Sequence, residues 1–205
     1  IKGSGVDINY FKKEKLFKSN ERTKLLFPAR LIKEKGIIEL INACNELWKE
    51  NYKFTLNIAG EIDKQNRSYL KNRYFKFIHK NPNIKFLGKC SDMKKVYIKM
   101  DIVILPSWRE GLSKALLESA AMSLPIITTD VPGCRDIITN NYSGLLVPAR
   151  NEKKLKFAIK KYLGNPELGI KYGENARKTV CSKFTIEIIN KKILKIYDEF
   201  LNIDK

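Results

Sequence analysis

The sequence predicts an α/β fold: an open, doubly wound, Rossmann-like parallel sheet of about six strands, with helices on both faces and a helical C-terminal tail. Short apolar runs alternate with amphipathic segments, which is the order that parallel strands joined by crossover helices require. The run at residues 102–105 is apolar throughout, as expected of a strand buried on both faces. Several of the runs end at a glycine, where a turn is expected.

The first half of the chain predicts three strands, at residues 24–29, 54–59 and 84–87. After the first strand and a turn at Lys35 and Gly36, apolar residues recur at helical spacing over residues 37–48. A second helix is expected over residues 65–79. Ser91 is suited to cap a short helix that runs to Met100.

The second half predicts three more strands, at residues 102–105, 126–128 and 144–147. Helices are expected over about 113–123 and from Arg135 onward. The triplet Asn165-Pro166-Glu167 has the cap, proline and acidic first turn of a helix start. A last helix is expected from Thr185. Its apolar stripe comprises Ile186, Ile189, Ile193, Ile196 and Phe200.

The domain organisation follows from this pattern. Residues 21–205 are expected to form one domain, since no repeat, low-complexity stretch or linker interrupts them. Residues 1–20 are less regular and are expected to be the end of a connection from another domain.

Composition and charge limit the classes of function. The chain has 205 residues, and 43% of them are hydrophobic, so it can bury a core without disulfides or metal. The chain contains no run of about 18 apolar residues, so the sequence predicts no membrane-spanning helix. The four cysteines lie far apart without a C-x-x-C pair, which disfavours zinc and favours reduced thiols in the cytoplasm. The net charge of +18 favours nucleic acid, anionic lipid or a phosphorylated ligand as partner, with a general lysine bias as the alternative explanation.

Ligands of open parallel sheets bind beyond the carboxyl ends of the strands, so the residues that follow each strand are the candidates. Arg30, Lys35 and Gly36 follow the first strand and precede a helix, where free amides and cations suit a phosphate. Glu110 lies in the loop after the fourth strand, and Glu118 lies in the next helix. A carboxylate can accept two hydrogen bonds from the neighbouring hydroxyls of a sugar.

Each candidate also has a structural alternative. Arg30 and Lys35 could be surface charges, and either glutamate could serve a helix dipole or a salt bridge. Lys114 opposes the dipole of its predicted helix, which a bound anion would offset; a solvated lysine is the alternative. Arg135, at the start of another expected helix, raises the same question.

Several nucleotide-binding and nucleic-acid-binding classes lack their signatures. Neither a Walker sequence nor a strand-preceded G-x-G-x-x-G is present, so ATPase and nicotinamide-dependent functions are disfavoured. The basic residues do not alternate with an aromatic RNP pattern, and no helix-turn-helix signature occurs, so nucleic acid is not the expected partner.

Several short motifs follow one another along the chain: Arg30-Leu31-x-x-x-Lys35-Gly36, Ile58-Ala59-Gly60, Phe86-Leu87-Gly88, Leu105-Pro106-Ser107-x-x-Glu110-Gly111-Leu112, Glu118, Pro125-Ile126-Ile127-Thr128-Thr129-Asp130-Val131-Pro132-Gly133 and Gly144-Leu145-Leu146-Val147-Pro148. Taken in order, they resemble the donor-binding C-terminal half of family 4 (group 1) retaining glycosyltransferases of the GT-B fold. The resemblance covers nearly the whole chain, and the two glutamates have the spacing of that family.

The resemblance implies a role for each site residue. Arg30 and Lys35 would hold the diphosphate of a nucleotide sugar and stabilise the leaving group. Glu110 would contact the donor sugar, and Glu118 the ribose. The amides around Gly111, Leu112 and Ser113 would help to hold the phosphate and the sugar, and the backbone at Gly60 and Lys89 would line the base. The family retains the anomeric configuration, generally without a metal or other cofactor in the site.

A narrower similarity points to bacterial enzymes that build capsule, O-antigen or other lipid-linked saccharides. It lies in residues 108–113 and 129–136, although Lys114 stands where an apolar residue or proline is usual. It implies a UDP-hexose or UDP-N-acetylhexosamine donor. The acceptor, a saccharide or a lipid-linked saccharide, would be held by an N-terminal domain that these residues do not include. The chain alone would then transfer little, and the apolar stripe of the last helix would be partly exposed.

These implications predict a cytoplasmic enzyme, with an anionic surface at the inner face of the cell membrane as a further expected contact. Two other function classes stay open. One is a non-catalytic module that binds a nucleotide sugar, which would not need both glutamates. The other is a basic protein for nucleic acid or membrane, whose binding would collapse with salt whatever the nucleotide. An epimerase or a phosphorylase on the same fold is a further alternative.

Overall fold

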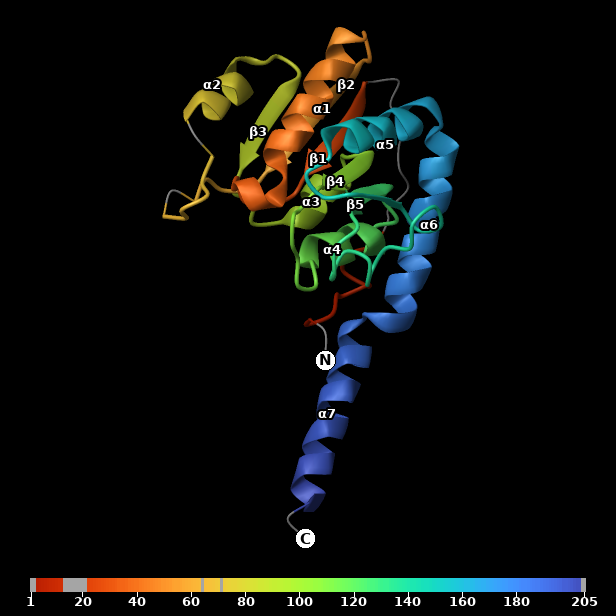
Figure 1. Ribbon diagram of the computed structural model, residues 1–205. Coiled ribbons are helices and arrows are strands. Elements are labelled where there is room, and N and C mark those ends of the chain that lie inside the picture. The colour runs from red at the N-terminus through yellow and green to blue at the C-terminus, as the bar shows by residue number, and fades with distance from the viewer. Residues whose placement is uncertain (1–2, 13–21, 64, 71, 204–205) are drawn as a thin grey trace.

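The computed structural model describes residues 3–12, 22–63, 65–70 and 72–203 (Figure 1). Within them, six parallel strands form one sheet in the order β3-β2-β1-β4-β5-β6. The strands are β1 (Thr23–Phe27), β2 (Phe54–Ala59), β3 (Ile84–Gly88), β4 (Ile102–Leu105), β5 (Ile126–Thr129) and β6 (Leu145–Val147). The order runs outward from β1 in one direction and from β4 in the other, which confirms the predicted doubly wound sheet.

The helices alternate with the strands, as the apolar pattern predicts. They are the 3₁₀ helix η1 (Lys33–Lys35), α1 (Ile37–Lys49), α2 (Asn72–Lys80), α3 (Met93–Tyr97), α4 (Lys114–Ala121), α5 (Glu152–Gly164), α6 (Pro166–Lys183) and α7 (Ile186–Ile203). Five of them begin at a polar residue whose side chain accepts a hydrogen bond from the first turn. These caps are Asp92, Ser113, Asn151, Asn165 and Thr185.

The sheet lies between two layers of helices (Figure 1). In one layer α1 packs beside α5, where Lys156 reaches Glu46 and Glu50 at 2.8 and 2.7 Å. In the other layer α4 packs beside α6. Every residue of β4 and β5 is buried, because these central strands are covered on both faces.

Four expectations about helices are wrong in detail. α2 begins at Asn72 rather than at residue 65, because Asn66 accepts hydrogen bonds from the Ser68 amide and hydroxyl and holds a turn there. Asp92, not Ser91, caps α3, which ends at Tyr97. The helix expected from Arg135 is a series of turns, since the Thr139 amide donates to the Ser143 hydroxyl at 2.8 Å and does not continue a helical ladder. Helix α5 is present in the structure but was not predicted from the sequence.

The N-terminal segment, residues 3–12, packs against the junction of α6 and α7. The Val6 amide donates to the Phe184 carbonyl at 2.9 Å, and the Ile186 amide donates to the Val6 carbonyl at 3.2 Å. Arg177 of α6 donates to the carbonyls of Ile8 and Phe11 at 3.4 and 3.0 Å. The expected connection at residues 1–20 lies partly outside the described residues.

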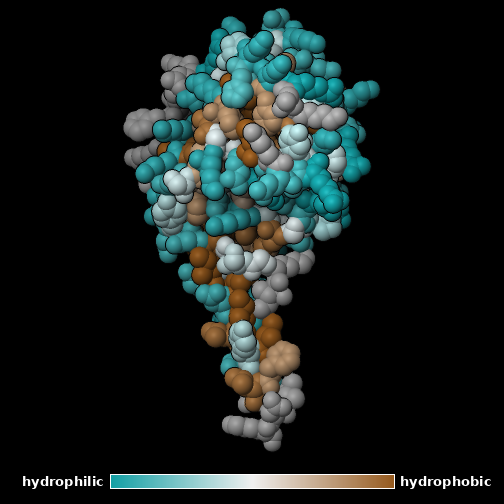
Figure 2. All heavy atoms as spheres, turned by 90° about the vertical axis from the view of Figure 1, so that its left-hand side faces the viewer, coloured by the Kyte–Doolittle hydropathy of each residue, from teal (hydrophilic) through white to brown (hydrophobic). Residues whose placement is uncertain are grey.

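Helix α7 extends away from the body of the molecule (Figure 1), and apolar side chains cover much of the face of it that Figure 2 shows. Ile189 of the predicted stripe is buried, whereas Phe200 is 68% exposed. Leu194, Tyr197 and Leu201 are also more than half exposed. Among the described helices, none has the length and apolarity needed to cross a bilayer.

Candidate functional site

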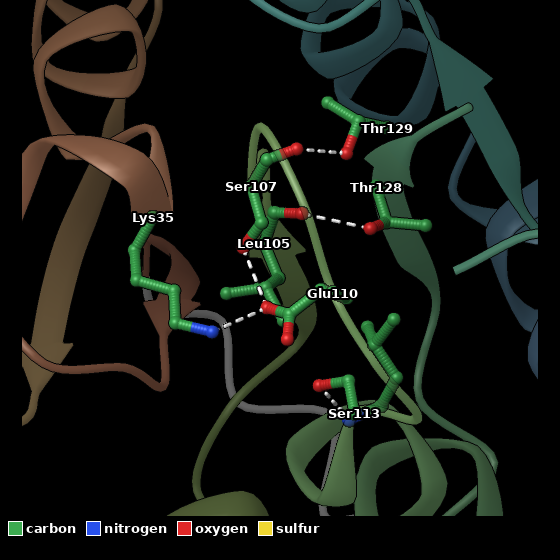
Figure 3. Close-up of polar contacts among 8 residues, drawn as sticks. Lys35, Leu105, Ser107, Glu110, Ser113, Thr128 and Thr129 are labelled. Carbon is green, nitrogen blue, oxygen red and sulfur yellow. Dashed lines mark hydrogen bonds and ion pairs between the residues drawn. The ribbon is translucent and has the colours of Figure 1, made fainter. Parts of the chain in front are cut away.

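The predicted candidates Lys35 and Glu110 meet at the point where the strand order changes direction. Lys35 ends η1, beyond the carboxyl end of β1, and Glu110 lies in the loop after the neighbouring β4. The Lys35 Nζ atom is 2.7 Å from Glu110 Oε1, and the Ser107 hydroxyl donates to the same oxygen at 2.7 Å (Figure 3). The two side chains are 23% and 8% exposed, so the pair is partly shielded from water.

Glycines allow the loops around this pair to come close together. Gly36 has a φ of 73°, and a Cβ atom there would overlap the Pro106 carbonyl, so the loop after β1 lies directly on the loop after β4. Gly133, with a φ of 80°, lies equally close to the Gly111 carbonyl, so the loop after β5 also packs on the loop after β4. Any side chain at either position would force these backbones apart.

Two threonines of β5 hold the other side of the loop after β4 (Figure 3). The Thr128 hydroxyl donates to the Leu105 carbonyl at 2.7 Å. The Thr129 hydroxyl donates to the Ser107 carbonyl, and both hydroxyls are buried. The backbone on either side of Pro106 is therefore fixed from β5, and this fixes the base of the loop that carries Glu110.

Trp108 anchors the same loop to α1. Its amide donates to the Glu34 carbonyl at 2.8 Å, and its indole donates to Glu39 Oε1 at 2.8 Å. The Arg150 guanidinium lies 4.1 Å from the centre of the indole ring, close enough for a cation–π contact. Glu39 is 8% exposed, and its Oε2 atom has no hydrogen-bond partner among the described residues.

Glu118, the second predicted carboxylate, lies in α4 with its side chain 8% exposed. The buried Tyr97 hydroxyl donates to Glu118 Oε2 at 3.1 Å, and the exposed Lys114 Nζ lies 3.8 Å from Glu118 Oε1. Burial raises the pKa of Glu118 above its ordinary value, while the Tyr97 hydrogen bond and the Lys114 charge lower it. Ser113 caps the helix by accepting from the Leu116 amide at 3.4 Å.

The remaining candidates surround this centre but are not paired with it. Arg30 is half exposed and pairs with Asp63 at 2.8 Å, not with Glu110. The Lys89 ammonium pairs with Glu61 at 3.2 Å. A Cβ atom at Gly60 would overlap the Ala29 carbonyl, so the ends of β1 and β2 are in backbone contact.

The last candidates lie beside the loop after β4. Gly111 is exposed and faces open space, and Leu112 is half buried. Lys114 and Arg135, for which the sequence left a bound anion open, each have a carboxylate partner. Lys114 lies near Glu118, and Arg135 pairs with Asp130 at 2.9 Å.

Sequence reasoning missed several residues that contact the candidates or anchor the loop that carries Glu110. Ser107 lies three positions before Glu110, inside a motif that was recognised, and its hydroxyl was the available signal. Tyr97 and Asp63 gave no local signal, because each meets its partner across more than 20 residues of chain. Trp108 also lies within a recognised motif, but its partner Glu39 is on another helix.

Comparison with known sequences bears on what such a site does. The family model described as "Glycosyl transferases group 1" matches residues 9–179. The capsular polysaccharide biosynthesis glycosyltransferase CapM of Staphylococcus aureus is 29% identical over 182 residues, which are 89% of this chain and 47% of that protein. The N,N'-diacetylbacillosaminyl-diphospho-undecaprenol alpha-1,3-N-acetylgalactosaminyltransferase of Campylobacter jejuni is 27% identical over 212 residues, covering 98% and 54% of the two proteins. The chain therefore spans about half the length of these curated relatives.

Solved structures show the same architecture. A glycosyltransferase from Rickettsia africae has 28% sequence identity and a TM-score of 0.84, over 96% of this chain and 56% of that one. HepE of Anabaena, solved with UDP and glucose, has 18% identity and a TM-score of 0.81, over 95% of this chain and 55% of that one. The second likeness concerns the fold alone. In both cases the described chain corresponds to about half of the other protein.

Proposed function

The chain belongs to the group 1 glycosyl transferase family, as its sequence motifs predict, and on that premise we propose that it binds the nucleotide-diphosphate sugar donor of a retaining sugar transfer. The proposed donor is a UDP-hexose or a UDP-N-acetylhexosamine. The proposed acceptor is a saccharide or a lipid-linked saccharide of bacterial surface polysaccharide synthesis. CapM and the Campylobacter enzyme, whose names specify capsule and undecaprenol-linked substrates, support this choice of acceptor.

The observation that carries the proposal is the Lys35–Glu110 pair at the switch point of the sheet. Ligands of doubly wound sheets bind at this point. Lys35 directly precedes α1, whose N-cap, Gly36, offers no side chain to the amides of the first turn. A diphosphate would therefore find a cation and free amides together. Glu110, already shielded from water, is suited to accept hydrogen bonds from sugar hydroxyls beside it.

In the proposed mechanism the protein stabilises charge that develops on the departing diphosphate. As the bond from the sugar to the diphosphate breaks, negative charge grows on the phosphate oxygens, and the Lys35 ammonium offsets it. Arg30 would exchange Asp63 for a phosphate oxygen when donor binds. Glu110 would hold the donor sugar in place. No metal is proposed, and the described residues do not gather three His, Cys, Asp or Glu side chains in a metal-binding arrangement.

The nucleoside is proposed to lie between Glu118 and the ends of β2 and β3. Glu118 would accept hydrogen bonds from the ribose hydroxyls. The backbone at Gly60 and Lys89 would line the base, and the amides of Gly111, Leu112 and Ser113 would face the phosphate and sugar. The UDP held by HepE, a protein of the same fold, supports uracil as the base.

The acceptor is proposed to bind on a further domain, since the relatives are about twice as long as the part matched here. Helix α7 is proposed to pack its apolar side against that domain. The exposed Leu194, Tyr197 and Phe200 support this proposal, because side chains of this kind are usually covered in a functional assembly. An anionic membrane surface is a further proposed contact, supported by the net charge of +18.

Isothermal titration calorimetry with uridine, UMP, UDP and UDP-sugars tests the donor proposal. UDP should bind more tightly than UMP, and Lys35→Ala should weaken UDP by about tenfold or more, the scale of one charge-assisted hydrogen bond. Lys195→Ala is the matched control, because it removes an exposed lysine that also has a glutamate partner, at 3.8 Å. Binding that is equal in the two variants, or that vanishes with salt for every ligand, would contradict the proposal.

A further inference from the structure

Tyr97 is the last residue of α3, and its side chain is completely buried. Its hydroxyl lies 3.1 Å from Glu118 Oε2 and 3.3 Å from the Ala115 carbonyl oxygen, both on α4. A tyrosine hydroxyl has one hydrogen to donate. The carboxylate is the stronger acceptor of the two, so that hydrogen is directed mainly to Glu118.

The two oxygens of Glu118 therefore face different surroundings. Oε2 points inward to Tyr97, which water does not reach. Oε1 points toward the Lys114 ammonium, whose side chain is 76% exposed. The carboxylate is thus turned so that one oxygen is held inside the protein and the other faces the exposed Lys114 ammonium on the outer side of α4.

Tyr97 is itself held firmly by its neighbours. The Phe11 ring meets the Tyr97 ring edge-on at 6.2 Å between centroids. The adjacent Tyr10 hydroxyl donates to Asp92 at 2.9 Å, and Asp92 caps the helix on which Tyr97 lies. The hydroxyl of Tyr97 can therefore orient Glu118 without a further loss of freedom in its own side chain.

We propose that Tyr97 is a positioning residue for donor binding: its hydroxyl holds Oε2 of Glu118 inward and so presents Oε1 to the hydroxyls of the donor ribose. The inference rests on the proposed function, since it deepens the role of Glu118 there. It assigns to a buried tyrosine, remote from the donor, a part of the selectivity for ribose over deoxyribose. Only a correctly turned carboxylate can accept from both neighbouring hydroxyls.

The protonation of Glu118 supplies the readout. Among the described residues, Tyr97 from α3 and Lys114 from its own helix contact this carboxyl, and Tyr10 of the N-terminal segment lies within range of its charge. Burial raises the pKa of Glu118, and the Tyr97 hydrogen bond is the largest influence that lowers it. Tyr97→Phe keeps the ring but removes the donor, so the pKa of Glu118 should rise further. UDP binding, which needs the carboxylate, is lost as the pH is lowered, and in Tyr97→Phe this loss should begin at a higher pH than in the wild-type protein.

The experiment compares Tyr97→Phe with Tyr162→Phe. Tyr162 is an equally buried tyrosine whose hydroxyl donates to the Ile126 carbonyl at 3.3 Å, so this variant also loses one buried hydroxyl. The carboxyl carbon of Glu118 is followed by NMR against pH, with Glu118→Gln to assign it. Tyr97→Phe should raise the pKa of Glu118 and reduce the preference for UDP over dUDP. It should also weaken UDP binding by about tenfold, the scale of one hydrogen bond to a charged group. Tyr162→Phe should change none of the three.

The failures of the two proposals are distinguishable. If the wild-type protein binds UDP and Tyr97→Phe binds it as Tyr162→Phe does, Tyr97 does not position Glu118. If the wild-type protein binds no nucleotide, the donor proposal fails and takes this inference with it. If Tyr97→Phe does not fold, the wild-type protein is titrated with UDP and followed by NMR. UDP must then shift the Glu118 carboxyl resonance and the Tyr97 ring resonances together. An unmoved pair overturns the inference.

Discussion

The indole of Trp108 donates a 2.8 Å hydrogen bond to Glu39, and this contact ties the loop after β4 to the first turn of α1. The two residues are 69 positions apart. Arg150, beyond β6, covers the other side of the indole at 4.1 Å. Two separate parts of the chain, α1 and the segment beyond β6, therefore hold the loop whose next acidic residue is Glu110.

Trp108→Phe is expected to destabilise the fold by about 1–3 kcal/mol, because it leaves the Glu39 carboxylate buried with neither oxygen paired. Urea unfolding measures the loss. Glu39→Gln is the control, since its amide oxygen still accepts from the indole while the buried charge is removed. A Trp108→Phe protein as stable as the Glu39→Gln protein would show that the hydrogen bond is not what holds the loop.

Lys35→Ala should destabilise the protein more than removal of an exposed lysine does. Glu110 is 8% exposed, so it would be left as a shielded charge whose remaining partner is the Ser107 hydroxyl, at a cost of about 1–3 kcal/mol. Thermal unfolding of Lys35→Ala, Glu110→Gln and the double variant separates the pairwise energy from the single losses. Strictly additive effects would mean that the 2.7 Å contact contributes nothing.

Glu118→Gln should stabilise the protein at neutral pH, although the residue is proposed to be essential for binding. Burial raises the pKa of Glu118 above 4.5 in the folded protein. The stability contributed by its protonated form is present below the unfolded pKa and is lost as pH rises through the higher folded pKa. The glutamine is neutral throughout and can still accept from Tyr97. The advantage of the variant should therefore be largest at pH 7 and should shrink toward pH 4.

Melting temperatures at a series of pH values check this prediction. Glu187→Gln is the control of opposite sign, because the Thr185 hydroxyl lowers the pKa of Glu187 in the folded protein. Its favourable contribution is present above the unfolded pKa and disappears as pH falls through the folded pKa. Both variants moving in the same direction with pH would contradict the assignment of Glu118 as a carboxyl disfavoured by burial.

The exposed apolar side of α7 predicts association that depends on protein concentration. Leu194 and Phe200 are 61% and 68% exposed on one projecting helix. Replacing both with serine should abolish the association in sedimentation velocity without lowering the melting temperature, since neither belongs to the core. Phe157→Ser is the control: its ring is 70% exposed, but on α5 rather than α7. A monomeric wild-type protein at high concentration would refute the expectation.

Strands were the most predictable elements, for a physical reason. Each central strand is buried on both faces, so the pattern is a continuous apolar run, as at residues 102–105. The helix expected from Arg135 failed because the Thr139 amide donates to the Ser143 hydroxyl at 2.8 Å instead of to the Arg135 carbonyl, a contact across a turn that the apolar pattern does not show. α5 was missed although Leu155, Ile159 and Tyr162 recur at helical spacing, with the lysines of this segment at other positions.

For the candidate site, the sequence predicted after which strands Lys35 and Glu110 lie, but not how the candidates pair. The sequence placed Lys35 and Glu110 after neighbouring strands, and strand order brings them together. It could not show that Arg30 would pair with Asp63, because Asp63 lies in an irregular segment after β2. Nor could it show Tyr97 beneath Glu118, which depends on how α3 packs on α4.

The contact between Gly133 and Gly111 limits how the proposed donor site could be re-engineered for another sugar. The two loops touch through backbone atoms, with no side chain between them that could be trimmed to make room. A loop transplanted from another transferase into either position alone would collide with the one left behind. The segments after β4 and β5 would have to be exchanged as one cassette with Gly133 kept, whereas the exposed Lys89 could be randomised by itself.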